Sequence, residues 1–207
     1  MGLKVEHVNK TYGTKKVVND ISFEIDKPSV YGLLGTNGAG KTTTIRMILG
    51  ILKKDSGEIS WNGKEVKRKN VNFGYLPEER GVYPKTKIYD QMMYFAELKG
   101  MKKEKAIESL KYWANRLEVE QYINMTPEKL SKGNQQKIQF ITAIIHDPEL
   151  IVLDEPFSGL DPVNTELLKN VIIELIRNGK YIIMSSHQMH SIEEFCSDVL
   201  ILNKGET

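Results

Sequence analysis

The chain has 207 residues, enough for one sizeable domain or for a domain with an inserted lobe. Its 29 Lys and Arg residues against 27 Asp and Glu give a net charge of +2, which provides no reason to expect nucleic acid as an obligatory partner. The lone Cys196 excludes an internal disulfide and fits a reducing cytoplasm. No signal peptide is visible, and no apolar run approaches the ~20 residues that cross a bilayer, so any membrane part must come from another chain.

The first third of the chain is predicted to be mostly strands. Apolar patterns and turn signals place strands at residues 3–10, 21–25, 30–34 and 72–76, and residues 56–64 are predicted to be a turn, a strand and a hairpin turn. A turn at residues 12–15 separates the first two strands, and Pro77 ends the last one.

The remainder alternates between helices and strands. Residues 89–146 are rich in Lys, Glu, Ala, Leu and Met and have few turn signals, which predicts helices. The continuous apolar run Leu150–Asp154 is typical of a strand buried on both faces of a parallel sheet. A helix near residues 163–178 and strands at 181–186 and 199–202 follow. This order predicts an α/β core in which the helical section is an inserted lobe.

The last residues look like an unfinished strand. Asn203-Lys204-Gly205 is predicted to be a turn, and Glu206-Thr207 begins what should be a returning strand. We therefore expect either a shortened chain or one without a C-terminal tail.

Residues 35–42, GTNGAGKT, fit the phosphate-binding pattern G-x-x-x-x-G-K-[ST]. An apolar run precedes them, and residues 43–49 have apolar side chains at helical spacing. Strand, glycine loop and helix are the arrangement that phosphate binding requires. A glycine-rich turn that merely joins strand and helix is the alternative, and both flanking segments disfavour it.

The loop has the parts needed to hold a triphosphate. Its glycines let backbone N–H groups turn toward phosphate oxygens, and the helix N-terminus adds its dipole. Lys41 would reach the β- and γ-phosphates, and Thr42 would place its hydroxyl on Mg²⁺. The residues predicted to bind the nucleotide here are Gly35, Thr36, Asn37, Gly38, Ala39, Gly40, Lys41, Thr42 and Thr43.

Two adjacent carboxylates, Asp154 and Glu155, end the apolar strand. Ligands bind at the carboxyl ends of parallel strands. Two carboxylates beside a polyphosphate would repel it unless one binds metal and the other binds water. We therefore expect Asp154 to hold Mg²⁺ and Glu155 to act as general base. The alternative is a solvated pair in a turn, which the preceding apolar run disfavours.

With these residues in this order, the chain resembles the ATP-binding cassette (ABC) ATPases over essentially its whole length. Tyr12 lies where the family stacks an aromatic ring on adenine. Leu130–Gln135, LSKGNQ, is similar to the family signature, and Ser158–Asp161, SGLD, to its D-loop. His187 follows a strand where the family has its switch histidine.

Two positions depart from the family pattern. In the common signature L-S-G-G-Q, Lys132 and Asn134 replace the first glycine and the glutamine, while Ser131 and Gly133 remain. Glu78 stands where the family has the glutamine that senses Mg²⁺ and the attacking water. Both departures resemble variants of single-cassette, export-type (ABC-2-like) subunits.

The resemblance implies a fold and an architecture. It implies a P-loop NTPase (RecA-like) α/β core with a parallel sheet, an N-terminal antiparallel β subdomain and an inserted α-helical lobe. Within a single domain over residues 1–207, residues 1–86 and 147–207 form the core and residues 87–146 form the helical signature lobe.

The resemblance also implies partners and site residues. We expect a head-to-tail homodimer that binds ATP and Mg²⁺, and that powers a separate membrane permease, an exporter, from the cytoplasmic face. The catalytic residues would be Glu155, His187 and Glu78. The metal ligands would be Thr42, Asp154 and Glu78. Further nucleotide contacts would come from Tyr12, Ser131, Gly133, Asn134 and Asp161.

Several alternatives remain. A soluble ABC protein acting on DNA would carry long heptads, and a ribosomal one would carry two cassettes. A plain P-loop kinase would have no use for a signature helix. Tyr12 alone could be an ordinary turn aromatic. His187 and His190 could be a metal pair, but no third ligand stands nearby, so we expect His190 at the surface. The lysine-rich residues 99–105 are expected to be a solvated helix turn, with anionic lipid contact as a minor alternative.

Overall fold

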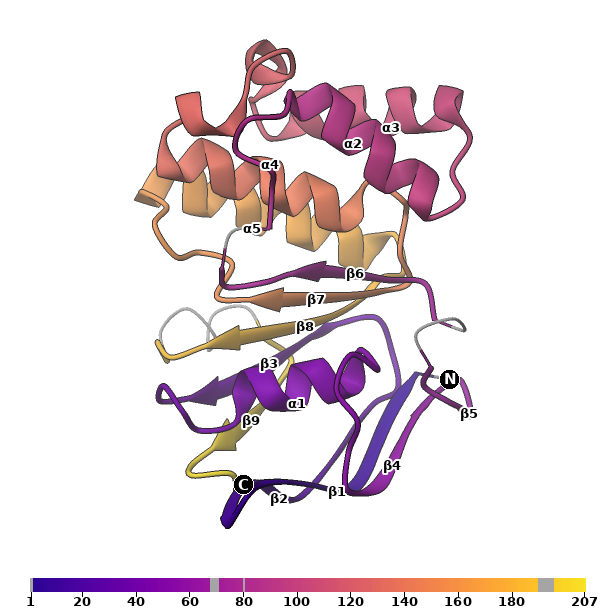
Figure 1. Cartoon of the computed structure of the whole chain (residues 1–207), viewed down its shortest axis with the longest axis vertical. Coiled ribbons are helices and arrows are strands. Elements are labelled where there is room, and N and C mark those ends of the chain that lie inside the picture. Colours follow the sequence, from indigo (N-terminus) through magenta and orange to yellow (C-terminus); the bar gives the residue numbers. More distant parts are fainter. Residues whose placement is uncertain (1, 68–70, 80, 190–195) are drawn as a thin grey trace.

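The computed structural model describes residues 2–67, 71–79, 81–189 and 196–207. This part of the chain forms two β-sheets and a group of α-helices (Figure 1). The strands are β1 (Leu3–Tyr12), β2 (Lys15–Ile25), β3 (Val30–Gly35), β4 (Ser56–Trp61), β5 (Lys64–Glu65), β6 (Phe73–Leu76), β7 (Leu150–Asp154), β8 (Tyr181–Ser186) and β9 (Asp198–Leu202). The helices are α1 (Lys41–Ile48), α2 (Ile88–Leu98), α3 (Lys103–Arg116), α4 (Lys132–Ile144) and α5 (Pro162–Arg177), with short 3-10 turns at Glu120–Tyr122 and Pro127–Lys129.

The N-terminal sheet is antiparallel, with the strand order β2-β1-β4-β5. The prediction that its second strand begins at residue 21 is wrong, because β2 begins at Lys15 directly after a two-residue turn. His7 and Asp20 both have left-handed backbone conformations, with φ of 52° and 55°, and the β1–β2 register shifts beside His7. Such irregularities interrupt the period-two pattern on which the sequence prediction relied.

The second sheet has the order β6-β7-β8-β3-β9, and its neighbouring strands are parallel. β7 has the bounds that the apolar run predicted. It is buried throughout because both faces are covered. Leu150 and Val152 belong to the core shared with α1 and the antiparallel sheet, whereas Ile151 and Leu153 pack in the core that includes the helical lobe. The predicted α/β architecture with a parallel sheet is confirmed.

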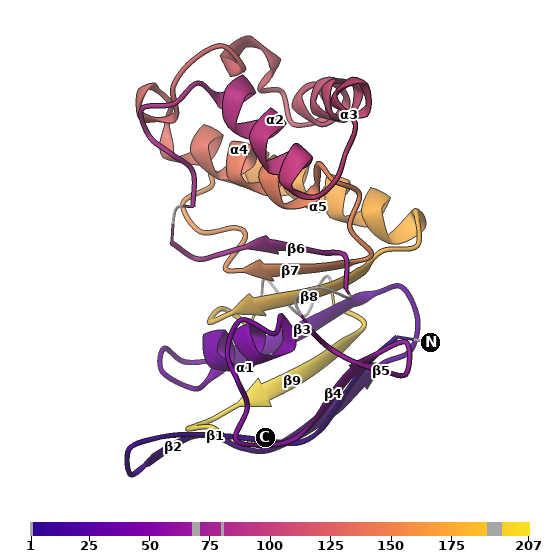
Figure 2. The ribbon, with the colours of Figure 1, turned by 45° about the vertical axis from the view of Figure 1, so that its right-hand side comes forward.

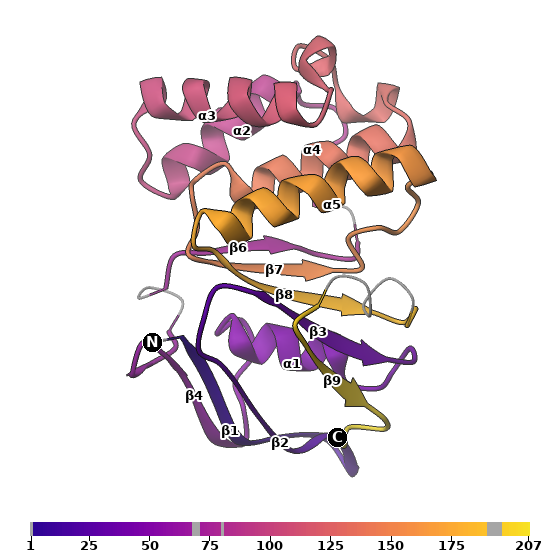
Figure 3. The ribbon, with the colours of Figure 1, turned by 180° about the vertical axis from the view of Figure 1, so that it is seen from behind.

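Different elements lie beside the two ends of this sheet. In Figures 2 and 3, α4 and α5 lie next to β6 and β7, and α2 and α3 lie farther out. α1 lies beside β3, with the antiparallel sheet beyond it. The contact between α4 and β6 is close, since a Cβ on Gly74 would lie 2.0 Å from the carbonyl oxygen of Ala143. No helix of the described residues is both long and apolar enough to cross a membrane.

Two polar segments can be compared with their predictions. Lys99, the first residue of the predicted solvated lysine cluster, donates a hydrogen bond to the carbonyl oxygen of Phe73 at 3.1 Å and lies 4.7 Å from the centre of its ring. Glu206 pairs with Asn203 in an isolated bridge, and its carboxylate accepts a hydrogen bond from the Asn19 side chain at 2.7 Å. Residues 102–105 are exposed, as expected for a solvated helix turn, and the bridge at residues 203–206 agrees with the predicted turn and returning strand.

Candidate nucleotide-binding site

The glycine loop between β3 and α1 adopts a conformation that glycine makes possible. Gly38 and Gly40 have positive φ angles of 81° and 109°. A Cβ on Gly40 would also lie 2.7 Å from the carbonyl oxygen of Val17. The N–H of Ala39 donates to the carbonyl oxygen of Thr36 at 3.0 Å and closes the turn. The backbone therefore curls in front of the N-terminus of α1, as phosphate binding requires.

A cleft of about 200 Å³ opens at this loop. Its lining residues are Val17, Thr36, Asn37, Gly38, Gly40, Lys41, Thr42, Thr43 and Glu78. Of the predicted loop residues, Gly35 and Ala39 do not line the cleft. A Cβ on Gly35 would lie 2.5 Å from the carbonyl oxygen of Leu202, and Ala39 is buried, so both support the loop from behind.

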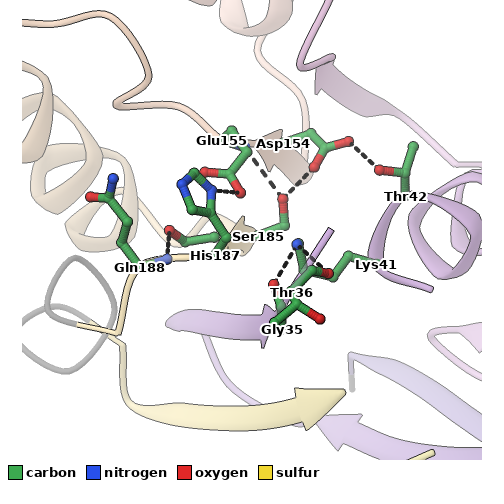
Figure 4. Close-up of polar contacts among 10 residues, drawn as sticks. Gly35, Thr36, Lys41, Thr42, Asp154, Glu155, Ser185, His187 and Gln188 are labelled. Atoms are coloured by element: carbon green, nitrogen blue, oxygen red, sulfur yellow. Dashed lines mark hydrogen bonds and ion pairs between the residues drawn. The ribbon is translucent and has the colours of Figure 1, made fainter. Parts of the chain in front are cut away.

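Lys41 is folded onto the loop itself. Its ammonium donates to the carbonyl oxygen of Gly35 at 2.6 Å and lies 3.4 Å from that of Thr36. The side chain is buried, so these carbonyls take the place of water around its charge. Figure 4 shows this side chain beside the group formed by Thr42 and Asp154. A cation held at the mouth of a curled N–H loop is suited to phosphate oxygens.

Asp154 is fixed from two sides at the end of β7. The hydroxyl of Thr42 donates to one of its carboxylate oxygens at 3.1 Å. The hydroxyl of Ser185 donates to the other in a short hydrogen bond (Figure 4). Sequence reasoning missed Ser185, although a serine close to the end of the neighbouring predicted strand was a signal that could have found it.

Glu155 follows in a strained backbone conformation. Its φ of 51° lies in the left-handed region that non-glycine residues rarely adopt. Its N–H is held by Ser185, 3.2 Å from the carbonyl oxygen and 3.3 Å from the hydroxyl. Its carboxylate lies 2.8 Å from Nδ1 of His187 (Figure 4). The side chain of Glu155 is 9% exposed and that of His187 is 47% exposed, so the carboxylate lies deeper than the imidazole.

Glu78 lies where the phosphate cleft meets a second cleft. This second cleft has a volume of about 370 Å³ and is lined by Thr42, Arg46, Tyr75, Pro77, Glu78, Glu79 and Asp154. Glu78 lines both clefts, whereas Glu79 lines only the second. Burial, with a contribution from the Asp154 carboxylate, raises the pKa of Tyr75 in the same cleft.

The oxygen atoms around Thr42 fit a magnesium ion. Mg²⁺ prefers hard oxygen ligands, and it typically takes one or two carboxylates together with substrate phosphates and waters. Thr42 and Asp154 are in contact, and Glu78 lines a cleft with both. No group of three or more His, Cys, Asp or Glu side chains able to hold a metal occurs among the described residues.

The signature residues lie at a different place. Ser131 precedes α4 and caps it by accepting a hydrogen bond from the N–H of Asn134 at 3.3 Å. A hydroxyl that accepts in this way can still donate its own hydrogen. Gly133 faces the D-loop, since a Cβ there would lie 3.5 Å from the side chain of Leu160. None of these residues lines the phosphate cleft.

Asp161 caps α5 and is linked to α4, the signature helix, by hydrogen bonds through Asn164. Its carboxylate accepts hydrogen bonds from the backbone N–H of Asn164 at 2.9 Å and from the side chain of the same residue. These hydrogen bonds lower the pKa of the Asp161 carboxyl group. Asn164 in turn accepts from the ammonium of Lys137, on α4, at 2.9 Å. The signature and the D-loop are therefore connected within one chain.

Tyr12 and His190 are the remaining residues with a prediction from the sequence. Tyr12 ends β1, is 51% exposed and does not line the phosphate cleft. The Lys10 ammonium lies 5.6 Å from the centre of its ring. Val17, which sequence reasoning did not select, brings the same hairpin to the cleft. His190, which we expected at the surface, lies outside the described residues.

Similarity to known proteins identifies the family. The family model described as "ABC transporter" matches residues 18–158. An uncharacterized ABC transporter ATP-binding protein of Bacillus subtilis, YhaQ, is 54% identical over 205 residues, which cover 99% of this chain and 69% of the relative. The Nod factor export ATP-binding protein I of Burkholderia lata is 32% identical over 203 residues, covering 96% of this chain and 67% of the relative.

A solved structure agrees with these relatives. The structure of the ATP-binding subunit of an ABC transporter superposes with a TM-score of 0.91 at 29% sequence identity, covering 100% of this chain and 88% of that one. It shares the cassette fold described above. The chain therefore belongs to the ABC transporter family, as an ATP-binding ATPase subunit that works with a membrane permease.

Proposed function

We propose that ATP is bound at the loop of residues 35–43 and hydrolysed with Glu155 as general base. The observation that carries this proposal is the contact between the Glu155 carboxylate and His187 Nδ1 at 2.8 Å, next to the Thr42–Asp154 pair. A carboxylate oriented in this way can accept a proton from water. In its protonated form His187 would donate from Nδ1 to Glu155 and from Nε2 toward the γ-phosphate.

We propose that Mg²⁺ is held by Thr42, Asp154 and Glu78. The hydroxyl and carboxylates supply hard oxygen atoms, and the nucleotide phosphates complete the coordination. When bound, the ion would neutralise charge on the β- and γ-phosphates. Asp154 is held by Thr42 and Ser185, so little rearrangement is needed for it to meet the ion.

We propose that the complete site needs two copies of the chain arranged head to tail. Ser131, Gly133 and Asn134 do not line the phosphate cleft of their own chain. In the proposed dimer, these signature residues and Asp161 would contact the ATP held by the partner's phosphate loop. Tyr12 would stack on the adenine ring, so that two ATP sites are completed. Contacts made through the γ-phosphate favour the closed dimer, so hydrolysis would release it.

The proposed setting is the inner face of a membrane, where a permease is bound from the cytoplasm. The 32% identical relative is a Nod factor export ATP-binding protein, which supports export as the direction of transport. The net charge of +2 supports a function without obligatory nucleic acid. We propose that residues 1–86 and 147–207 act as the nucleotide-binding core, and that residues 87–146 transmit its closure to the permease.

Two variants test the assignment of roles. Glu155→Gln should bind ATP within about threefold of wild type and lose ~99% of turnover, because it removes the proton acceptor and keeps the shape. Lys41→Ala should weaken ATP binding itself by about tenfold or more. Nucleotide affinity by fluorescence and steady-state phosphate release measure both effects. Wild-type turnover in Glu155→Gln would show that another group is the base.

A further inference from the structure

The side chain of Gln139 is hydrogen-bonded to the loop that carries Glu78. It lies on α4 and is only 3% exposed. Its side-chain nitrogen donates to the carbonyl oxygen of Pro77 at 3.0 Å and to that of Glu79 at 3.1 Å. These two carbonyls lie on either side of Glu78, so one amide group spans the residue from behind.

The direction of this amide is fixed by its surroundings. Two carbonyl oxygens need donors, and a flipped amide would place its own oxygen against both of them. The Gln139 Oε1 atom is buried and has no partner among the described residues. The side chain is therefore held in place by its two donated hydrogen bonds.

The same helix carries the signature. Ser131 caps α4, and Gln139 lies about two turns farther along. Gln136, on this helix too, donates to the carbonyl oxygen of Pro156, next to Glu155. A helix held by its own hydrogen bonds moves as a unit. A shift of the signature end would thus be passed to the carbonyls beside Glu78.

We propose that Gln139 is a positioning residue that holds Glu78 at the nucleotide cleft and links its position to the signature helix. The proposal rests on the metal-binding role proposed for Glu78. Gln139 does not contact the reacting atoms. Gln139 orients Glu78, the proposed metal ligand, through the backbone on either side of it. Its removal should therefore change the Mg²⁺ concentration that hydrolysis requires more than it changes ATP affinity.

Gln135 provides a matched control. It lies on α4, is 9% exposed, and its side-chain nitrogen also donates to two carbonyl oxygens, those of Pro127 at 2.9 Å and Leu130 at 3.0 Å. These carbonyls belong to the helical lobe and do not flank Glu78. Gln135→Met removes the same chemistry at similar burial, and it reports the cost of losing two buried hydrogen bonds.

The experiment is an ATPase titration with Mg²⁺ at saturating ATP, together with thermal unfolding. Gln139→Met should raise the Mg²⁺ concentration for half-maximal activity by about tenfold, as loss of partners that orient metal ligands does. Gln135→Met should lower the melting temperature by a similar amount; because Gln135 borders the signature, its maximal turnover can change, but the Mg²⁺ concentration for half-maximal activity should stay within about twofold of wild type. Gln139→Glu keeps the shape of glutamine but places a carboxyl group against the two carbonyl oxygens, so the required Mg²⁺ concentration should rise at least as much as in Gln139→Met, and this variant gives a second reading.

A double variant separates the possible failures. If Gln139 acts through Glu78, adding Gln139→Met to Glu78→Ala should not raise the required Mg²⁺ further. A wild-type Mg²⁺ requirement in Gln139→Met and Gln139→Glu, beside a raised one in Glu78→Ala, would overturn the role of Gln139 alone. A wild-type requirement in Glu78→Ala as well would overturn the proposed metal role of Glu78, and the proposal would fall with it.

Discussion

Asp154 illustrates how single side chains are prepared for their role. Thr42 donates to one of its oxygens at 3.1 Å and Ser185 to the other, so the carboxylate cannot rotate freely. Ser185 also holds the N–H of Glu155, at 3.3 Å from its hydroxyl. One serine thus holds the carboxylate of the proposed metal ligand and the backbone of the proposed base. A side chain fixed before the nucleotide arrives loses little conformational entropy on binding.

Glu78 carries a prediction at this scale. Glutamate keeps the oxygen that a glutamine would offer to Mg²⁺ but adds a charge near the triphosphate. Glu78→Gln should therefore retain ATPase activity and reach half its maximum at a lower Mg²⁺ concentration, because repulsion of the γ-phosphate is removed. Glu78→Ala should impair hydrolysis.

Glu79 is the competing residue. It lines the second cleft with Thr42 and Asp154 but not the phosphate cleft, whereas Glu78 lines both. Glu79→Ala should therefore leave the Mg²⁺ titration of ATPase activity close to that of wild type. If Glu79→Ala is impaired and Glu78→Ala is not, our alignment to the family is wrong by one residue.

At the scale of elements, a close approach between helix and sheet gives a stability prediction. A Cβ on Gly74, in β6, would lie 2.0 Å from the carbonyl oxygen of Ala143, in α4, and 3.0 Å from the ring of Pro148. Backbone atoms cannot move aside as a flexible side chain can. Gly74→Ala should lower the free energy of unfolding by about 3 kcal/mol, at the upper end of overpacking effects, as measured by urea denaturation. Gly63→Ala, in a turn with a positive φ but open space around it, separates backbone strain from overpacking.

Elements were predictable from sequence where one physical signal dominated. The bounds of β7 follow from an unbroken apolar run, because a strand covered on both faces has no polar positions. The start of β2 was not predictable. Lys15 and Lys16 are exposed there, and the left-handed Asp20 breaks the alternation. Local pattern predicts an element only where burial is regular.

The site was predictable in part for a related reason. The loop of residues 35–42 and the Asp154-Glu155 pair are contiguous in sequence, so motif and strand position were enough to select them. Ser185 acts through a partner 31 residues away, and Gln139 through partners 60 and 62 residues away, and only the fold brings those partners together. A serine and a glutamine in a strand and a helix carry no local sign of these contacts.

For the whole molecule, a buried histidine predicts how stability depends on pH. His146 is 8% exposed, and its Nε2 donates to the carbonyl oxygen of Phe73 at 3.0 Å. Burial lowers the pKa of His146 to about 4, against 6.5 when unfolded. The unfolded chain therefore binds the proton first, and as pH falls from 6.5 to about 4 this group should remove at most about 3 kcal/mol of stability. His146→Gln should lose this part of the pH dependence in urea unfolding at pH 7, 6 and 5. An unchanged pH dependence would show that other groups control it.

The central claim is that a complete ATP site is formed by two chains. It is tested most directly by the mass in solution of Glu155→Gln, which should bind ATP without hydrolysing it. With ATP and Mg²⁺, light scattering should give twice the 23.6 kDa of one chain, and with ADP it should give the single mass. Adding Ser131→Arg should abolish the doubling, because a long side chain would occupy the end of α4 that is proposed to meet the partner's ATP. A single mass at saturating ATP, or a doubled mass regardless of nucleotide, would contradict the account.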